Sequence, residues 1–218
     1  DFLRASGTVT AATLMPGMAP SMVQAAPLLN RIGFQLYTAR KAMKQDLPGT
    51  LQELATIGYR EVEFAGYFNH SPKQIADALA ENGLSAPSAH VSLEALREQL
   101  DNVLEAALLI GHDYLVLPWL SKQSFSQIEH YEELAAFLNK VGKSCQEAGL
   151  AFAYHNHDFE FEMLSGKRPY DLLLEQTDPA LVHMELDLYW VARSGVDPSH
   201  YLKKFPGRFP MVHVKDMD

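Results

Sequence analysis

Residues 150–162 read LAFAYHNHDFEFE, a short apolar run that changes abruptly into histidines and carboxylates. Two later stretches follow the same plan, residues 181–187 (LVHMELD) and residues 209–216 (FPMVHVKD). Short apolar runs of this kind are typical of buried strands. Three strands that each end in His, Asp, Glu or Lys predict one site built from strand ends.

The chain from residue 32 onward repeats strand, helix and glycine at intervals of roughly 30 residues, which is the βα unit of a parallel α/β fold. Four further strands are predicted at 32–37, 59–64, 84–91 and 114–118. Helices are predicted at 47–57, 72–81, 93–110, 131–148, 170–176 and 198–205. The order of these elements gives seven units.

Seven parallel units favour a (β/α)₈ TIM-type barrel over an open sheet, which usually has five or six. No glycine-rich phosphate loop follows the first strand, and the polar residues fall at strand C-termini, where a barrel keeps its active site. We therefore expect a barrel domain over residues 30–218. Because the chain stops just past the seventh strand, we expect its eighth unit to be missing from this sequence.

The composition excludes some classes of function. A net charge of −9 and a pI near 5.4 argue against a nucleic-acid-binding surface, which requires a clustered basic face. The single cysteine, Cys145, permits no intramolecular disulfide and is predicted to be a small buried apolar residue rather than a nucleophile.

Residues 1–29 do not have the pattern of the repeat. A basic start, a weakly apolar middle and small residues near Ala26 follow the order of a secretory signal. The run Phe2-Leu3-Arg4 also resembles the tail of a twin-arginine export motif. We expect an export-signal remnant or a disordered arm, and hence a periplasmic or exported protein, with a cytoplasmic one as the alternative. The apolar part is too interrupted for a transmembrane helix.

Residues two apart on a strand face the same side, so each of the last three strands delivers a set of polar side chains. The sets are His155 with His157, then His183, Glu185 and Asp187, then His213 with Lys215. Mixed imidazole and carboxylate ligands suit Mn²⁺, Zn²⁺, Co²⁺ or Fe²⁺, and carboxylate-rich sets suit Mg²⁺ or Mn²⁺.

Each of these residues also has a structural interpretation. A single histidine near a strand end is more often hydrogen-bonded than metal-bound, and His183, at the start of its strand, is predicted to be structural. Glu185 could be a buried partner of Lys215. For His155, Asp187 and His213 together, however, three apolar strands would each carry a costly polar group inward. We predict these three as metal ligands.

At these residues the sequence resembles the xylose-isomerase-like TIM-barrel superfamily, within the group called sugar phosphate isomerases/epimerases. The resemblance covers nearly all of the chain from residue 32. The matching stretches are residues 33–40 (GFQLYTAR), 58–63 (GYREVE), 154–161 (YHNHDFEF), 185–190 (ELDLYW) and 213–216 (HVKD).

The resemblance implies a divalent metal held by the last four strands, with Asp187 and His213 in the usual strand-six and strand-seven places. The usual strand-five glutamate is replaced by His155, and Glu160 falls where a substrate-facing carboxylate sits. Alternatively, the histidines act as bases while Glu160 or Glu162 binds the metal. The ion is expected to be Mn, Zn, Mg or Co, and the catalytic residues Glu160, His157 and Lys215. Substrate contacts are predicted for Gln35, Glu63, His90, Glu185, Trp190 and Asp216.

Three functions follow from this site. The first is a metal-dependent isomerase or epimerase of a sugar or keto-sugar, which removes a proton next to a polarised carbonyl. The second is a lyase or hydratase acting on 3-keto-glycosides or keto-inositols, and the third is a non-catalytic sugar-binding barrel. The abasic-site endonucleases of the superfamily carry a histidine where this chain has Trp190. We expect a small carbohydrate as partner, no nucleic acid and no membrane, and a homo-oligomer is left open.

Overall fold

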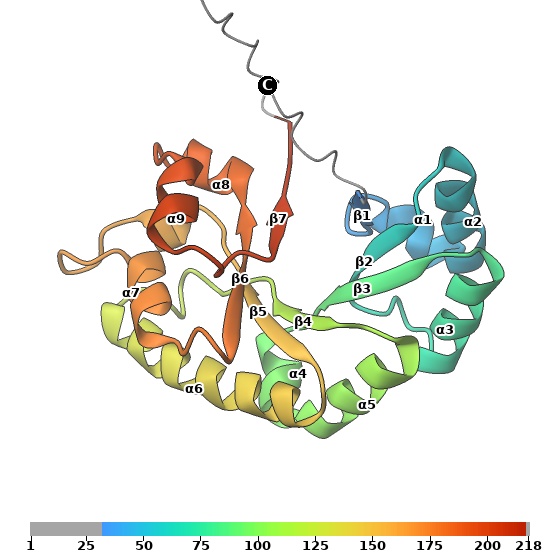
Figure 1. Cartoon of the computed structure of the whole chain (residues 1–218), viewed down its shortest axis with the longest axis horizontal. Helices are drawn as coiled ribbons and strands as arrows, with labels where there is room; N and C mark the ends of the chain where they lie inside the picture. Colours follow the sequence, from blue (N-terminus) through green and yellow to red (C-terminus); the bar gives the residue numbers. More distant parts are fainter. Residues whose placement is uncertain (1–31, 217–218) are drawn as a thin grey trace, which may run out of the picture. The chain divides into compact units, whose positions relative to one another are not determined.

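A computed structural model of the chain describes residues 32–216 and contains seven parallel strands in sequential order. The strands are β1 (Gly33–Gln35), β2 (Glu61–Ala65), β3 (Ser85–His90), β4 (Tyr114–Leu117), β5 (Ala151–His155), β6 (Val182–Asp187) and β7 (Met211–His213). Each strand pairs with the next in the chain. The sheet curls into an open arc with β1 and β7 at its edges (Figure 1). The predicted α/β TIM-type fold is confirmed.

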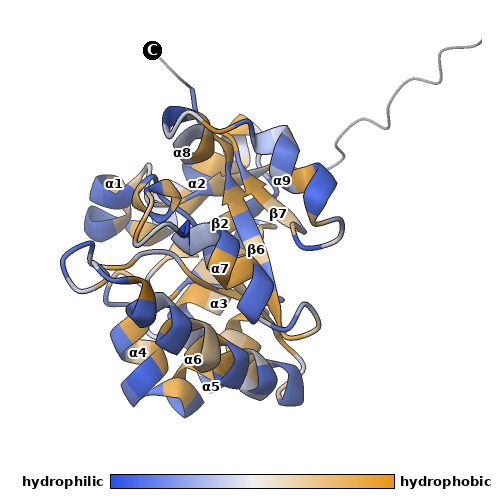
Figure 2. Ribbon diagram, turned by 90° about the vertical axis from the view of Figure 1, so that its left-hand side faces the viewer, coloured by the Kyte–Doolittle hydropathy of each residue, from blue (hydrophilic) through white to orange (hydrophobic). Residues whose placement is uncertain are grey.

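Helices follow the strands and cover the outer, convex side of the arc (Figure 1). The helices are α1 (Arg40–Gln45), α2 (Leu47–Ile57), α3 (Pro72–Glu81), α4 (Leu93–Glu98), α5 (Leu100–Ile110), α6 (Ile128–Glu147), η1 (Phe159–Phe161), α7 (Pro169–Gln176), α8 (Leu188–Arg193) and α9 (Pro198–Lys204). In Figure 2 the strands carry much of the apolar sequence, while polar residues gather on the helices.

Local sequence signals explain where the helices begin and end. Ser71 and Gln74 form a reciprocal capping box at the start of α3, with Pro72 in the first turn. Gly58 ends α2 with φ +123°, a backbone conformation that favours glycine. Both helices keep the predicted bounds.

The single helix predicted over 93–110 was wrong, because it is two helices. Gln99 has non-helical backbone angles (φ −139°, ψ 30°) and separates α4 from α5. The apolar pattern runs unbroken through this bend, because both helices bury residues against the same core, such as Leu96 and Ala107. The sequence pattern therefore gave no sign of the break.

The strands alternate between an apolar face toward the helices and a polar face toward the inside of the arc. On β6, Met184 and Leu186 belong to the buried apolar core, whereas Glu185 and Asp187 are buried polar residues between and after them. Neighbouring residues of a strand point to opposite faces, so the two carboxylates share the inner face. The fold thus directs the polar residues of several strands into one interior.

The predicted segment 1–29 lies outside the described residues, so the export signal stays a prediction. Within residues 32–216, no helix combines the length and apolarity that crossing a membrane requires. Cys145 is fully buried, as predicted, and burial raises the pKa of its thiol to about 12.

Candidate metal centre

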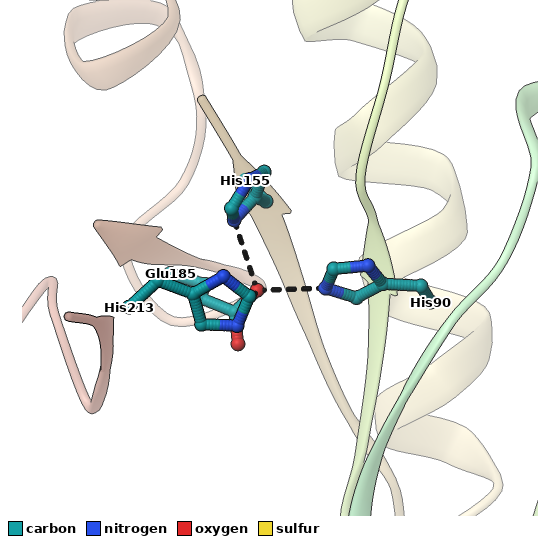
Figure 3. A group of neighbouring side chains, drawn as sticks. All are labelled: His90, His155, Glu185 and His213. Atoms are coloured by element: carbon teal, nitrogen blue, oxygen red, sulfur yellow. Dashed lines mark hydrogen bonds and ion pairs between the residues drawn. The ribbon is translucent and has the colours of Figure 1, made fainter. Parts of the chain in front are cut away.

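Four residues from four strands form a group that could hold a metal ion (Figure 3). His90, His155 and His213 end β3, β5 and β7, and Glu185 lies two residues before the end of β6. One ligand atom from each residue lies within 4.8 Å of the others. Parallel strands with the same order as the chain bring these C-terminal ends to one edge of the sheet.

The geometry of the group fits a divalent cation. Oε2 of Glu185 lies 2.9 Å from Nε2 of His90, 3.1 Å from Nδ1 of His155 and 3.4 Å from Nε2 of His213. In a tetrahedral zinc site with ligand bonds of 2.0–2.1 Å, neighbouring ligand atoms are about 3.3 Å apart. Three imidazoles and one carboxylate, all buried or nearly so, are a donor set that Zn²⁺, Co²⁺ or Mn²⁺ accepts.

A second carboxylate, that of Glu63 on β2, contacts the same ring nitrogens of His90 and His213 as Glu185 does. Its Oε1 lies 2.8 Å from Nε2 of His213 and 3.0 Å from Nε2 of His90, and it accepts a hydrogen bond from Gln35. Its Oε2 accepts a hydrogen bond from Ser88. Four of the predicted substrate residues, Gln35, Glu63, His90 and Glu185, are therefore part of the centre or in contact with it.

The paired charges shift the pKa values of this centre. Burial opposes the charged forms, but the attraction of Glu63 and Glu185 outweighs it and raises the pKa of His90 to about 9. Asp187 and Glu63 similarly outweigh burial at His213 and raise its pKa to about 10. In return, these imidazoles hold the pKa of Glu63 well below its ordinary value, against the effect of burial.

Two members of the centre shift in the opposite direction. Burial, with the positive charges of His213 and His90, lowers the pKa of His155 well below its ordinary value. Burial and the neighbouring Glu63 carboxylate raise the pKa of Glu185 to about 7. His155 is thus a neutral imidazole at physiological pH, which is the form that binds metals.

Asp187, one of the three predicted metal ligands, lies against the outer side of the same centre. Its Oδ2 lies 2.5 Å from Nζ of Lys215, and its Oδ1 accepts a hydrogen bond of 3.1 Å from the backbone N–H of Trp190. Its own backbone N–H donates to Oδ1 of Asn156, the residue after β5. Asn156 therefore ties the end of β5 to the end of β6, a role that its position in the sequence did not reveal.

His157 lies beside the centre in an aromatic setting. Its ring stacks on Phe159, with centroids 6.0 Å apart, and is tilted against Trp190 at 5.4 Å. Its buried Nδ1 has no hydrogen-bond partner among residues 32–216. Burial, with the charge of Lys215, lowers the pKa of His157 to about 4, so this imidazole is neutral at physiological pH and can accept a proton.

Glu160 lies on a different side of β5. It is fully buried, and it accepts hydrogen bonds from the hydroxyl of Tyr154 and from the backbone N–H of His157. Tyr154 precedes His155 on the strand, so its side chain points to the helix face and not to the interior that holds the histidines. Of the other predicted residues, Asp216 is exposed at the end of the described chain.

Relatives of the chain agree with the resemblance seen in its sequence. No family profile matches the chain. It is 37% identical over 191 residues to an inosose dehydratase of Clostridium tetani, covering 77% of this chain but only 62% of that relative. It is 24% identical over 206 residues to an inosose dehydratase of Geobacillus kaustophilus and spans 66% of its length. The chain thus spans less than two thirds of these relatives.

Solved structures confirm the predicted resemblance to sugar phosphate isomerases/epimerases and xylose-isomerase-like TIM barrels. A sugar phosphate isomerase/epimerase from Parabacteroides distasonis superposes with a TM-score of 0.74 at 26% identity, over 91% of this chain and 79% of that one. An IOLI protein with a bound zinc atom shares the fold, with a TM-score of 0.65 at 12% identity over 86% and 73% of the two chains.

Proposed function

We propose that this chain, whose homologues are named inosose dehydratase and whose solved neighbours are xylose-isomerase-like TIM barrels, catalyses metal-dependent loss of water from a keto-cyclitol or keto-sugar. The observation that carries the proposal is the group of three imidazoles and one carboxylate, with the neutral His157 beside it. The names of the homologues favour the lyase or hydratase hypothesis over the isomerase.

The ligands in this proposal are His90, His155, Glu185 and His213. A divalent ion bound there would polarise the substrate carbonyl and so make the adjacent C–H bond more acidic. The side chain of Gln35 contacts Nδ1 of His90, whereas Glu63 contacts Nε2 of His90 and of His213, the nitrogens that also face Glu185.

His157 acts as the base in this proposal. A general base must be unprotonated at the working pH, and burial keeps its imidazole neutral. It takes the proton from the carbon next to the carbonyl, and a hydroxyl leaves from the following carbon as water after taking a proton from Lys215. Glu160 accepts a hydrogen bond from the backbone N–H of His157. This contact supports a role in positioning the base rather than in direct proton transfer.

An isomerase or epimerase remains the second candidate. The 26%-identical neighbour is named a sugar phosphate isomerase/epimerase, and the same proton abstraction begins both reactions. The two differ only in the fate of the resulting anion, which either expels a hydroxyl or takes the proton back at another position.

Two parallel incubations separate the hypotheses. Zinc-loaded protein in D₂O is incubated with an inosose and, in parallel, with a 3-keto-glycoside. The masses of the products are measured by mass spectrometry. A product lighter by one water, or release of the aglycone, supports the lyase. A deuterated isomer supports the isomerase, and binding without either product contradicts both enzymes. His157→Gln is expected to abolish turnover, and His183→Gln, a β6 histidine that faces Tyr114, serves as its matched control.

A further inference from the structure

A buried carboxyl group lies on the far side of β5 from the interior of the arc. Glu160 is fully buried, and its Oε1 accepts a hydrogen bond of 2.5 Å from the hydroxyl of Tyr154. Tyr154 precedes His155 on β5, so its side chain points to the helix layer, whereas that of His155 points to the interior. The strand itself therefore separates this pair from the histidines.

The same carboxyl group contacts the backbone of the proposed base. Oε2 of Glu160 accepts a hydrogen bond of 3.0 Å from the backbone N–H of His157. Glu160 belongs to η1, and so does Phe159, on whose ring the imidazole of His157 stacks with centroids 6.0 Å apart. One short turn thus provides a contact to the backbone and a contact to the ring of His157, and both restrict where that imidazole lies.

Phenols surround Glu160 in the helix layer. Tyr131 on α6 and Tyr170 on α7 are fully buried, and burial, with an added effect of the charge of Glu160, raises the pKa of both. No ion pair includes Glu160 among the residues that the structure describes. Burial, and to a smaller extent the charge of Asp158, raise its pKa to about 7, while the hydrogen bond from Tyr154 opposes this rise. Glu160 therefore gains and loses its proton near neutral pH.

We propose that Tyr154 and Glu160 position His157 from behind the strand, and that they hold it firmly only when the carboxyl group of Glu160 has lost its proton. A carboxylate accepts hydrogen bonds more strongly than a neutral carboxyl group does. The hydroxyl of Tyr154 donates to the carboxylate and so favours the charged form. Because a general base works only when it is well placed, the protonation of Glu160 then controls turnover. This inference rests on the role of His157 proposed above and adds a regulation by pH to it.

The proposal assigns one limb of the pH profile. Above pH 7, Glu160 is charged and holds the base, and below pH 7 it is protonated, so turnover falls. The imidazole of His157 is neutral on both sides of this pH, because its own pKa is lowered to about 4. A fall in turnover near pH 7 therefore does not come from protonation of the base itself.

Turnover of an inosose by the zinc-loaded protein, measured from about pH 5 to about pH 9, tests this limb. Tyr154→Phe removes the donor, so the midpoint is expected to rise by about 1–2 pH units. Glu160→Gln has no proton to lose and can still accept the N–H of His157, so it is expected to keep turnover and to lose the limb. Tyr170→Phe removes another buried hydroxyl, which has no hydrogen-bond partner within residues 32–216, and is expected to leave the midpoint unchanged.

The backbone amide of His157 tests the contact without turnover. In protein labelled with ¹⁵N at histidine, its resonance is expected to shift with a midpoint near pH 7. The midpoint is expected at higher pH in Tyr154→Phe, and the shift is expected to disappear in Glu160→Gln.

The outcomes separate this inference from the proposed function. Glu185 also has a pKa of about 7, so a limb and an amide shift that survive in Glu160→Gln would belong to another group and overturn the role of Glu160. A midpoint that does not move in Tyr154→Phe overturns the role of Tyr154. Either result leaves His157 as the proposed base, whereas a wild type that turns over neither substrate overturns the proposed function.

Discussion

Nε2 of His213 on β7 lies 2.8 Å from Oε1 of Glu63 on β2, although 150 residues separate the two in the chain. Four strands, β3 to β6, lie between β2 and β7 in the order of the sheet. A flat sheet would hold these side chains several strand widths apart, at about 4.8 Å per strand. The contact therefore requires the sheet to curl, and the interior of the arc is where the candidate metal centre lies.

His213→Ala tests the centre most directly. The substitution removes one of three imidazoles, so we expect bound zinc per chain to fall well below that of the wild type after dialysis against a weak chelator. His183→Ala removes a β6 histidine that packs against Tyr114 and is expected to keep the wild-type zinc content. Metal analysis by mass spectrometry gives both values, and equal zinc in the two variants would remove His213 from the ligand set.

Zinc binding is expected to strengthen as the pH rises. The pKa values of about 9 for His90 and about 10 for His213 mean that both rings are protonated at neutral pH before an ion binds. Zinc must displace these protons, so the apparent affinity should rise about tenfold per displaced proton for each unit of pH below these values. Calorimetry at pH 7 in buffers of different ionisation enthalpy should show about two protons released per ion, and no dependence on the buffer would contradict this protonation.

Glu160 is expected to make the stability of the fold depend on pH. Burial raises its pKa from 4.5 to about 7, so its contribution is fully favourable below pH 4.5 and is lost as the pH rises toward 7. The shift corresponds to a loss on the order of 3 kcal/mol. Urea unfolding at pH 4.5 and pH 8 should show this difference in the wild type and a smaller one in Glu160→Gln. Because the amide oxygen can still accept the N–H of His157 and the amide carries no charge, the variant should be more stable than the wild type at pH 8.

Gly142→Ala should destabilise the protein although alanine is the better helix former. A Cβ atom at Gly142 on α6 would lie 2.4 Å from the backbone oxygen of Leu181, which precedes β6. We expect a net loss of about 1–3 kcal/mol in the free energy of unfolding. Lys143→Ala, on the exposed side of the same helix, should stay within about 0.5 kcal/mol of the wild type. Similar free energies of unfolding for the two variants would show that α6 can shift away from Leu181 without loss of stability.

The sequence predicted the fold well because the signals for its elements are local. The caps at Ser71 and Gly58 and the apolar runs of the strands act over a few residues, and the order of the units then determines a parallel sheet. The break at Gln99 was missed because a bend between two helices that share one core leaves the apolar pattern intact.

The site was predictable in composition but not in detail. Alternation along a strand places Glu185 and Asp187 on one face. It does not tell which nitrogen of each histidine lies near which of the two carboxylates. That depends on the register between strands, in which Glu185 pairs with His155 and Asp187 pairs with His213. Likewise, Glu160 follows β5 closely in sequence, but the turn at η1 carries it to the helix side, where Tyr154 holds it.

In the interior of the arc, acidic and basic side chains lie close together and carry opposite charges. The carboxylates of Glu63, Glu185 and Asp187 stand against the cations of His90, His213 and Lys215. Many small zinc proteins have no preformed site in the unfolded chain and fold only when the ion binds. Here protonated imidazoles and the lysine pair with the acids, so we expect this domain to fold without an ion and an ion at the candidate centre to bind afterwards. Which ion it carries would then be decided by the supply where the finished protein resides, and not by the conditions of its synthesis.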